Sequence, residues 1–407
     1  MKEYQSYTLK NGLRIVHKPL NSNVSYCGFI VNAGTRDEKS NEHGMAHFVE
    51  HMLFKGTQKR KSHHIINRME SVGGEINAYT NKEETVIYSV FLEEHYERAF
   101  ELLTDLTFHS IFPPKEVEKE IEVILDEINS YEDNPSELIF DEFENIIFRD
   151  SQLGHNILGE EESLINFTPE KGNDFVRKYY IPQNIVFFSL GKTDIKKIVR
   201  LAEKYLSELY APAIDSTRIK PRLTTPTKNI IDKDTSQAHV MIGSKCYDLH
   251  DPNRRALYLL NNILGGPGMN SRLNISLREK RGYVYNVESS MTNYSDTGVF
   301  SIYFGSDKKN ADKCIELIQK ELKKLQETKL TTLQLSSAKK QLIGQISISG
   351  DNHENLALAL GKNYLHYNHF NSLEETIKKI DNININDILE VANTIFNTDK
   401  LSYIIYK

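Results

Sequence analysis

Two histidines and a glutamate stand together in the stretch His-Phe-Val-Glu-His at residues 47–51. On a helix, at about 100° per residue, His47, Glu50 and His51 fall within one arc of about 100°. Two imidazoles four residues apart can bind one metal ion from consecutive turns, and the carboxylate beside them could take a proton from water at that ion. Zinc suits such ligands and leaves a fourth position open, as in catalytic sites. A helix with solvated histidines would show the same pattern, so the motif alone leaves both interpretations open.

A zinc site of this kind needs a third protein ligand, and the helical stretch 115–131 offers carboxylates for it. Glu120 and Glu127 are seven residues apart, so they project within about 20° of each other, at the edge of an apolar stripe. A half-buried carboxylate is costly unless it meets a cation. Glu127 as the ligand with Glu120 behind it fits this reasoning. The alternative is a helix with a solvated acidic face, which the spacing alone favours for Glu120.

The second half of the chain repeats the first. An offset of 210 residues places Ala46 on Ala256 and Gly56 on Gly266, and two later segments keep nearly the same offset and order. The metal-site candidates are absent from the second copy, while the apolar spacing survives. If the halves are copies, the fold does not require these polar groups, which favours a chemical role for them. The residues in the places of His47, Glu50, His51 and Glu127 are Leu257, Leu260, Asn261 and Gln345.

Five longer stretches carry a resemblance to a known family. The chain resembles the pitrilysin/insulinase family of zinc peptidases, which have the inverted motif H-x-x-E-H and are called inverzincins. Within that family it is similar to the short subgroup typified by the mitochondrial processing peptidase and its bacterial relatives. The stretches are GMAHFVEHMLFKGT (44–57), GGEINAYTNKEETVIYSV (73–90), EVILDEINSYEDNP (122–135), HNILGEEESLINF (155–167) and LGGPGMNSRLNISLREKRGYVYNV (264–287).

The resemblance implies roles for the metal-site candidates. His47, His51 and Glu127 would be the ligands of one Zn²⁺ per chain, Glu50 the general base, and Glu120 a supporting carboxylate. The family's distal glutamate lies about 76 positions after the second histidine of the motif, and 51 + 76 is 127. None of the three cysteines is near the motif, which argues against a structural zinc site with a filled fourth position.

The resemblance also implies residues that contact the substrate. In the family an arginine and a tyrosine of a second domain contact the peptide and the tetrahedral intermediate, and they correspond here to Arg278 and Tyr285, with Tyr283 as the alternative to Tyr285. The stretch 75–80 corresponds to an edge strand on which peptides lie, so Asn77 and Ala78 would pair with the peptide backbone by β-augmentation. Without the resemblance, an ordinary salt bridge and a core aromatic side chain are the simpler interpretations of Arg278 and Tyr285.

The function implied is that of a zinc metallo-endopeptidase. Family members of this length form half of a clamshell chamber, so two chains would close around an unfolded peptide. A homodimer is expected, although a heterodimer stays open, and Arg278 and Tyr285 could act in the same or the facing subunit. Two alternatives are a non-catalytic scaffold subunit, which would usually lack metal ligands, and a zinc-binding structural protein without hydrolytic activity.

The elements expected around these residues predict an α+β fold. Two homologous domains are expected, each a mostly antiparallel β-sheet packed with helices on one face. Residues 1–211 would form the catalytic domain, and residues 231–407 its counterpart without zinc ligands. Three prolines in a polar, threonine-rich stretch indicate a linker at 212–230.

Composition narrows the classes of protein to which this chain could belong. The chain has 407 residues with 39% hydrophobic and 26% charged side chains, which is typical of a globular protein of two or three domains. A net charge of −6 gives no basic footprint for nucleic acid. No apolar run approaches the roughly 18 residues of a membrane span, and no signal-peptide core is present. Three scattered cysteines favour a reducing compartment. We therefore expect a cytoplasmic protein that contacts neither membrane nor nucleic acid.

Overall fold

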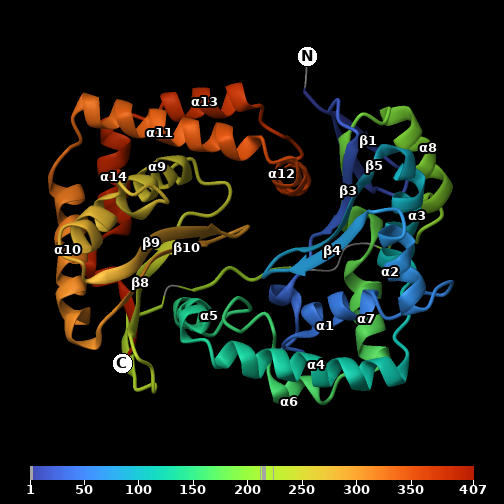
Figure 1. Ribbon diagram of the computed structural model, residues 1–407, viewed down its shortest axis with the longest axis horizontal. Helices are drawn as coiled ribbons and strands as arrows, with labels where there is room; N and C mark the ends of the chain where they lie inside the picture. The colour runs from blue at the N-terminus through green and yellow to red at the C-terminus, as the bar shows by residue number, and fades with distance from the viewer. Residues whose placement is uncertain (1–2, 211, 213–216, 223) are drawn as a thin grey trace. The chain divides into compact units, whose positions relative to one another are not determined.

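The computed structural model describes residues 3–210, 212, 217–222 and 224–407 (Figure 1). The chain divides into two compact units. The α+β class with two mostly antiparallel sheets is confirmed. Unit 1 comprises Met1–Asn129, Asn156–Arg218 and Ser349–Ser372, and unit 2 comprises Ser130–His155, Ile219–Ile348 and Leu373–Lys407.

Unit 1 is built on a six-stranded sheet in the order β1-β2-β6-β3-β5-β4. Neighbouring strands are antiparallel except β2 and β6, which are parallel. Strand β4 therefore forms one edge of the sheet. The strands are β1 (Gln5–Thr8), β2 (Arg14–Pro19), β3 (Val24–Val31), β4 (Glu75–Thr80), β5 (Thr85–Leu92) and β6 (Ile185–Gly191).

Helices cover both faces of this sheet, whereas the sequence predicted one covered face. Side chains alternate along a strand, so Phe29 and Ile30 of β3 enter different cores. Phe29 packs with α1 and α3, and Ile30 belongs to a cluster with Leu360 of α12. Helix α12 comes from the far end of the sequence, and Figure 1 shows it in orange beside the blue strands. Gly361 permits this approach, because a Cβ there would lie 2.7 Å from the ring of Phe188.

The helices of unit 1 follow the amphipathic patterns of the sequence. Helix α8, for example, buries Ile198, Leu201 and Leu206 and exposes Lys196 and Lys204. The helices are α1 (Met45–Leu53), α2 (Ser62–Glu70), α3 (Tyr96–His109), α4 (Pro114–Glu132), α6 (Glu161–Leu164), α7 (Pro169–Tyr179), α8 (Ile195–Leu206) and α12 (His353–Tyr367).

Unit 2 repeats this sheet topology with one strand fewer. Its order is β7-β11-β8-β10-β9, and β7 and β11 form a parallel pair as β2 and β6 do. Strand β9 thus holds the edge position that β4 holds in unit 1. The elements are β7 (Lys228–Ile231), β8 (Ala238–Cys246), β9 (Val284–Asn293), β10 (Gly298–Ser306), β11 (Ser402–Tyr406), α5 (Pro135–Ile147), α9 (Arg254–Gly265), α10 (Ala311–Glu327), α11 (Thr332–Gly350), α13 (Leu373–Asp381) and α14 (Ile385–Ile395).

The division of the chain differs from the contiguous domains 1–211 and 231–407. Helix α5 from the first half packs Ile139 and Phe143 on the sheet of unit 2, and α12 from the second half packs on the sheet of unit 1. Each sheet thereby gains an apolar cover for its second face. The predicted linker 212–230 contains residues 213–216 and 223, which lie outside the described residues, and its last residues form the start of β7.

No helix among the described residues is long and apolar enough to span a membrane.

Candidate metal centre

Helix α1 carries the histidine motif, and its first turn is held by a buried carboxylate. Glu38 is 5% exposed and accepts hydrogen bonds from the backbone N–H of Gly44 at 2.9 Å and of Ala46 at 2.8 Å. Gly44 has φ 94°, a conformation that favours glycine, and a Cβ there would lie 2.7 Å from the carbonyl oxygen of Leu158. The helix start is therefore fixed three residues before His47.

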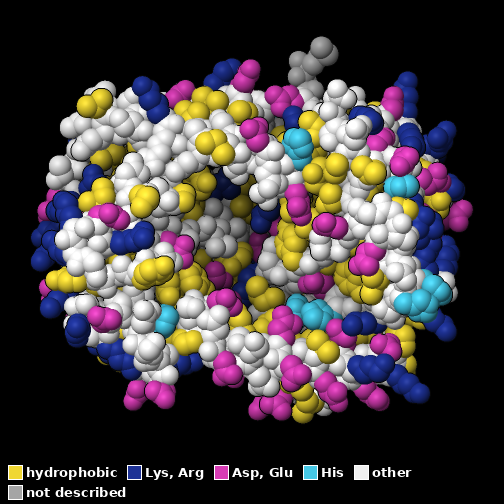
Figure 2. Space-filling view, in the orientation of Figure 1, with side chains coloured by type: hydrophobic (Ala, Val, Ile, Leu, Met, Phe, Trp, Pro, Cys, Tyr) yellow, Lys and Arg dark blue, Asp and Glu magenta, His cyan; other side chains and the backbone are white. Residues whose placement is uncertain are grey.

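The side chains of His47, His51 and Glu127 converge. The Nε2 atoms of the two histidines lie 3.1 Å apart. Oε2 of Glu127 lies 3.9 Å from Nε2 of His47 and 3.8 Å from Nε2 of His51. All three ligand atoms lie within 4.8 Å of one another, so one ion could contact all of them. Figure 2 shows histidine side chains flanked by carboxylates over α1 on this face.

Glu120 and Lys55 support the second histidine. With its Nδ1 protonated, His51 donates a hydrogen bond to Oε1 of Glu120 at 2.8 Å, which leaves Nε2 available as a ligand atom. Lys55 Nζ lies 2.5 Å from the other oxygen of Glu120. Burial opposes ionisation of Glu120, but the hydrogen bonds from His51 and Lys55 outweigh it and lower the pKa of this carboxyl. Lys55 was not among the residues predicted from the sequence, although it stands one helical turn after His51.

The surroundings of the two imidazoles shift their pKa values in opposite directions. Burial, with a smaller contribution from His51, lowers the pKa of His47 to about 3, so His47 is neutral at pH 7. Burial also opposes the charged form of His51, but the hydrogen bond to Glu120 outweighs it and raises the pKa of His51. A metal ion bound at Nε2 of His51 would take the place of the proton that the charged ring carries on that atom. The neutral ring of His47 is the form that coordinates zinc.

Glu50 lies on the same helix and is half-buried, and burial raises the pKa of its carboxyl. Its Oε2 is a buried atom without a hydrogen-bond partner among the described residues, as is Nδ1 of His47. Orphaned polar atoms of this kind are unfavourable in a folded protein unless a ligand, ion or water meets them. A raised pKa is also a property of carboxylates that take up and release protons.

The donor set fits a zinc ion. Two imidazole nitrogens and one carboxylate oxygen are the ligands of a common type of catalytic zinc site, in which the fourth position is open. No other cluster of three or more ligating side chains is found in the part of the chain that the structure describes. We conclude that these three residues could hold one divalent ion beside Glu50.

Asn77 and Ala78 lie in β4, at the sheet edge. They pair with Tyr88 and Ile87 of β5, and in the described chain no strand pairs with the other side of β4. Helix α1 packs against this strand. The edge that could accept an extended peptide is therefore close to the helix that carries the histidines.

Arg278 and Tyr285 lie in unit 2, whereas the metal-site residues lie in unit 1. Arg278 belongs to a π-helical turn, Asn274–Glu279, and its side chain is exposed. Tyr285 lies in the edge strand β9 and is 84% exposed. Neither is a buried core residue. Their catalytic roles stay predictions.

Comparison with known proteins identifies the family. The family described as "Insulinase (Peptidase family M16)" matches residues 14–161, and the one described as "Peptidase M16 inactive domain" matches residues 166–342. An uncharacterized zinc protease of Rickettsia felis is 35% identical over 412 residues, covering 100% of this chain and 98% of that protein. The chain belongs to peptidase family M16. The uncharacterized zinc protease YmxG of Bacillus subtilis is 32% identical, covering 97% of the M16 chain described here and 96% of its own length.

Solved structures share the fold of this M16 chain. A protease from Helicobacter pylori matches with a TM-score of 0.94 at 23% identity, covering 100% of both chains. A peptidase M16 inactive domain from Pseudomonas fluorescens matches with a TM-score of 0.92 at 21% identity, covering 99% of this chain and 97% of the other. The predicted resemblance to the pitrilysin/insulinase family is thereby confirmed, together with the two-domain fold.

Proposed function

We propose that this protein is a zinc metallo-endopeptidase that cleaves unfolded peptides. The observation that carries the proposal is the convergence of His47, His51 and Glu127 within 4.8 Å, with the half-buried carboxylate of Glu50 on the helix that carries both histidines. The names of the relatives, which call them zinc proteases, support it.

Each residue of the site has a separate role in the proposed reaction. Zn²⁺, when bound by His47, His51 and Glu127, supplies Lewis-acid polarisation of the scissile carbonyl and makes water more acidic. Glu50 accepts the proton of the attacking water and passes it to the leaving amine. Its burial raises its pKa, which moves it toward the range in which it can do both. Glu120 orients the ring of His51 through the 2.8 Å hydrogen bond.

The peptide is held along β4 in this proposal. Its backbone would pair with the free edge beside Asn77 and Ala78, so that it enters extended and unfolded. Arg278 and Tyr285 would stabilise negative charge on the tetrahedral intermediate. Two copies of the chain would close as a homodimer around the peptide, each chain forming half of the chamber. Sedimentation analysis tests that part, because a mass of one chain would rule the chamber out.

Zinc content and peptide cleavage test the catalytic proposal together. Wild type and Glu50→Gln are each loaded with zinc, dialysed and incubated with a mixed peptide library. We expect one zinc per chain in both proteins and turnover only in wild type, with kcat at least about 100-fold lower in the variant. Glu118→Gln is the matched control, since Glu118 is an exposed carboxylate on α4, and it should cleave like wild type.

A scaffold subunit is the alternative function. Zinc binding in both proteins with cleavage by neither would support the scaffold, whereas a chain that takes up no zinc would contradict the peptidase function.

A further inference from the structure

The turn that closes the β4–β5 hairpin is unusually buried. Thr80 and Thr85 are the last paired residues, and Asn81 Oδ1 accepts hydrogen bonds from the backbone N–H of Glu83 and Glu84 at 3.0 and 2.8 Å. The charged side chains that follow Asn81 are 2–4% exposed. Hairpin turns normally lie at the surface with solvated charges, so other parts of the chain must cover this one. The three buried charged residues are Lys82, Glu83 and Glu84.

The segment before α1 contacts the backbone of the turn directly. The N–H of Thr35 donates to the carbonyl of Asn81 at 3.1 Å, and the N–H of Arg36 donates to that of Lys82 at 2.7 Å. Gly34 lies against the turn so closely that a Cβ would be 2.2 Å from the Asn81 carbonyl oxygen. The fully buried Arg36 side chain also bonds Glu83, at 2.6 Å.

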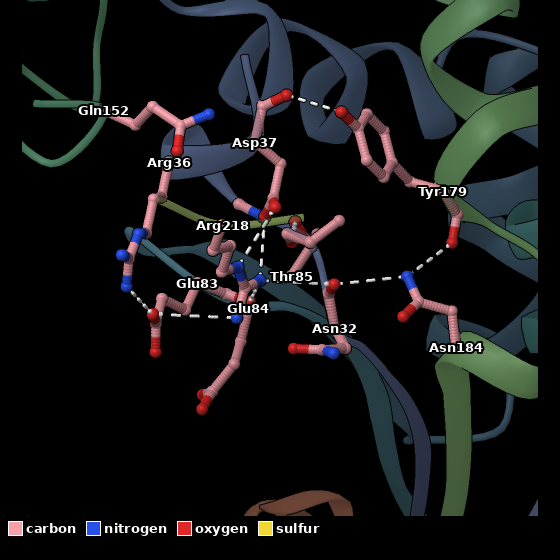
Figure 3. A network of polar contacts seen from close by, with 12 residues as sticks. Asn32, Arg36, Asp37, Glu83, Glu84, Thr85, Gln152, Tyr179, Asn184 and Arg218 are labelled. Carbon is pink, nitrogen blue, oxygen red and sulfur yellow. Dashed lines mark hydrogen bonds and ion pairs between the residues drawn. The ribbon is translucent and has the colours of Figure 1, made fainter. Parts of the chain in front are cut away.

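Arg218 contacts the turn from the connection between the units. Its guanidinium makes a bidentate pair with Asp37, at 3.0 and 2.8 Å, and donates to the carbonyl of Glu83 at 2.9 Å. Figure 3 shows these side chains converging from separate segments. Arg218 is the last residue of its segment of unit 1, and Ile219 already belongs to unit 2.

Helix α12 contacts the same turn through Glu84. Lys362 Nζ lies 3.1 Å from one oxygen of Glu84, and Nε2 of His366 bonds the other. Helix α12 lies in the segment 349–372, which belongs to unit 1 but is flanked in sequence by residues of unit 2. Two segments at which the chain passes between its units are therefore fastened to one hairpin turn, and that turn adjoins the edge strand β4.

We infer that Arg218 is a positioning residue for peptide binding: it fixes the Asn81–Glu84 turn and thereby the edge of β4 along which the substrate lies. The inference rests on the proposed function, because it names what holds the peptide-binding strand of that site. A planar guanidinium suits this task, since it bonds a carboxylate with two N–H groups and a carbonyl with a third. Arg218 touches neither the metal ligands nor Glu50 in its hydrogen bonds, so zinc binding should not depend on it.

Kinetics of Arg218→Met and Arg218→Lys test the inference. We expect the KM for a peptide to rise at least about fivefold in Arg218→Met with kcat within about twofold of wild type, and an intermediate KM in Arg218→Lys. Zinc content should stay at one per chain. The matched control is Arg60→Met, because Arg60 is 16% exposed against 14% for Arg218 and likewise pairs with carboxylates, those of Glu101 and Asp105. A wild-type KM in Arg218→Met, or the same KM change in Arg60→Met, would overturn the inference.

Hydrogen exchange of β4 gives a second readout that needs no activity. The amides of Ile76–Thr80 should exchange faster in Arg218→Met than in wild type or Arg60→Met. Unchanged exchange overturns the inference. If wild type cleaves no peptide, the proposed function fails, while faster exchange in the variant still supports the positioning of β4. If Arg218→Met does not fold, Arg218→Lys, which keeps the charge, decides through the same two measurements.

Discussion

The two units share a sheet order but differ in what they bury. Strands β2, β6, β3, β5 and β4 have the same order and orientations as β7, β11, β8, β10 and β9. Every buried Asp, Glu, Lys and Arg among the described residues nevertheless lies in unit 1. Burying a charge costs free energy unless the charge is paired. Unit 1 therefore has an energetic cost that unit 2, with the same sheet topology, does not have. These residues are Arg36, Asp37, Glu38, Lys82, Glu83, Glu84, Asp105 and Glu120.

The same contrast holds between helix α1, which carries the candidate metal-site histidines, and its counterpart in unit 2, helix α9. Helix α1 presents polar side chains where α9 presents Leu257 and Leu260, which are both 0% exposed. Asn261 takes the place of His51 and is 9% exposed. Because unit 2 forms the same topology with apolar side chains in these places of α9, the polar side chains of α1 are not a folding requirement. We propose that the polar side chains lower the stability of unit 1 and are present for the chemistry proposed for this site.

The most severe test of this contrast replaces the two histidines of α1 by the residues that α9 has in their places. The double variant His47→Leu, His51→Asn gives α1 the residues of α9. We expect zinc content to fall from one per chain to less than about 0.1, because two of three ligands are lost. The unfolding free energy of the metal-free chain should change by no more than about 1 kcal/mol, since removal of the orphaned Nδ1 of His47 offsets the lost hydrogen bond from His51 to Glu120.

Metal analysis and urea unfolding in a chelator measure both effects. The reciprocal change Leu257→His is the control, and it should bind no zinc and lose about 2 kcal/mol of stability. A metal-free double variant that is strongly destabilised would mean that the histidines are structural.

Glu84→Gln tests the buried charges of unit 1. Burial opposes ionisation of Glu84, but His366 and Lys362 outweigh it and lower its pKa to about 2, from 4.5. A lowered folded-state pKa stabilises the protein above the unfolded pKa, and this contribution is lost as pH falls toward 2. We expect the metal-free variant to be less stable than wild type by about 3 kcal/mol at pH 7 and by less than half of that near pH 3.

Urea unfolding at the two pH values measures the difference. The exposed Glu118→Gln should show no such dependence. A stability difference that does not change with pH would contradict the ion-pair explanation.

Glu120→Gln tests whether the second carboxylate supports the metal centre. The amide can still accept from His51 but is uncharged, so we expect zinc affinity to fall about 10- to 100-fold. Competition with a chelator of known affinity measures it. Equal affinity in variant and wild type would reduce Glu120 to an ordinary helix-face residue, the interpretation that spacing alone favoured.

Asn261→Leu is the mildest test and acts on unit 2. Oδ1 of Asn261 is a buried acceptor without a hydrogen-bond partner among the described residues. Replacing it with an apolar side chain should raise the unfolding free energy by about 1 kcal/mol and leave zinc content unchanged. A loss of stability in thermal or urea unfolding would show that this amide has a role of its own.

The amino-acid sequence alone was enough to predict the types of ligand and the helix that presents two of them. A motif spanning five residues fixes His47, Glu50 and His51 on one helix face, because helical periodicity is local. The repeat also identified a unit without metal ligands, since it needs only an offset between two stretches. Helix spacing offered Glu127 as the third ligand with Glu120 behind it, and the family resemblance implied the same residue.

Which carboxylate contacts which imidazole ring, and which helix covers each sheet, could be learned from the folded chain alone. The bond of Glu120 to His51, with Lys55 behind it, depends on how α4 packs against α1. That α5 packs on the sheet of unit 2 and α12 on the sheet of unit 1 could not be predicted from the sequence for the same reason. An amphipathic pattern shows that a helix has an apolar face, but it does not show which sheet that face will cover. The hydrophobic effect is non-directional, so any apolar surface of suitable size can bury the face.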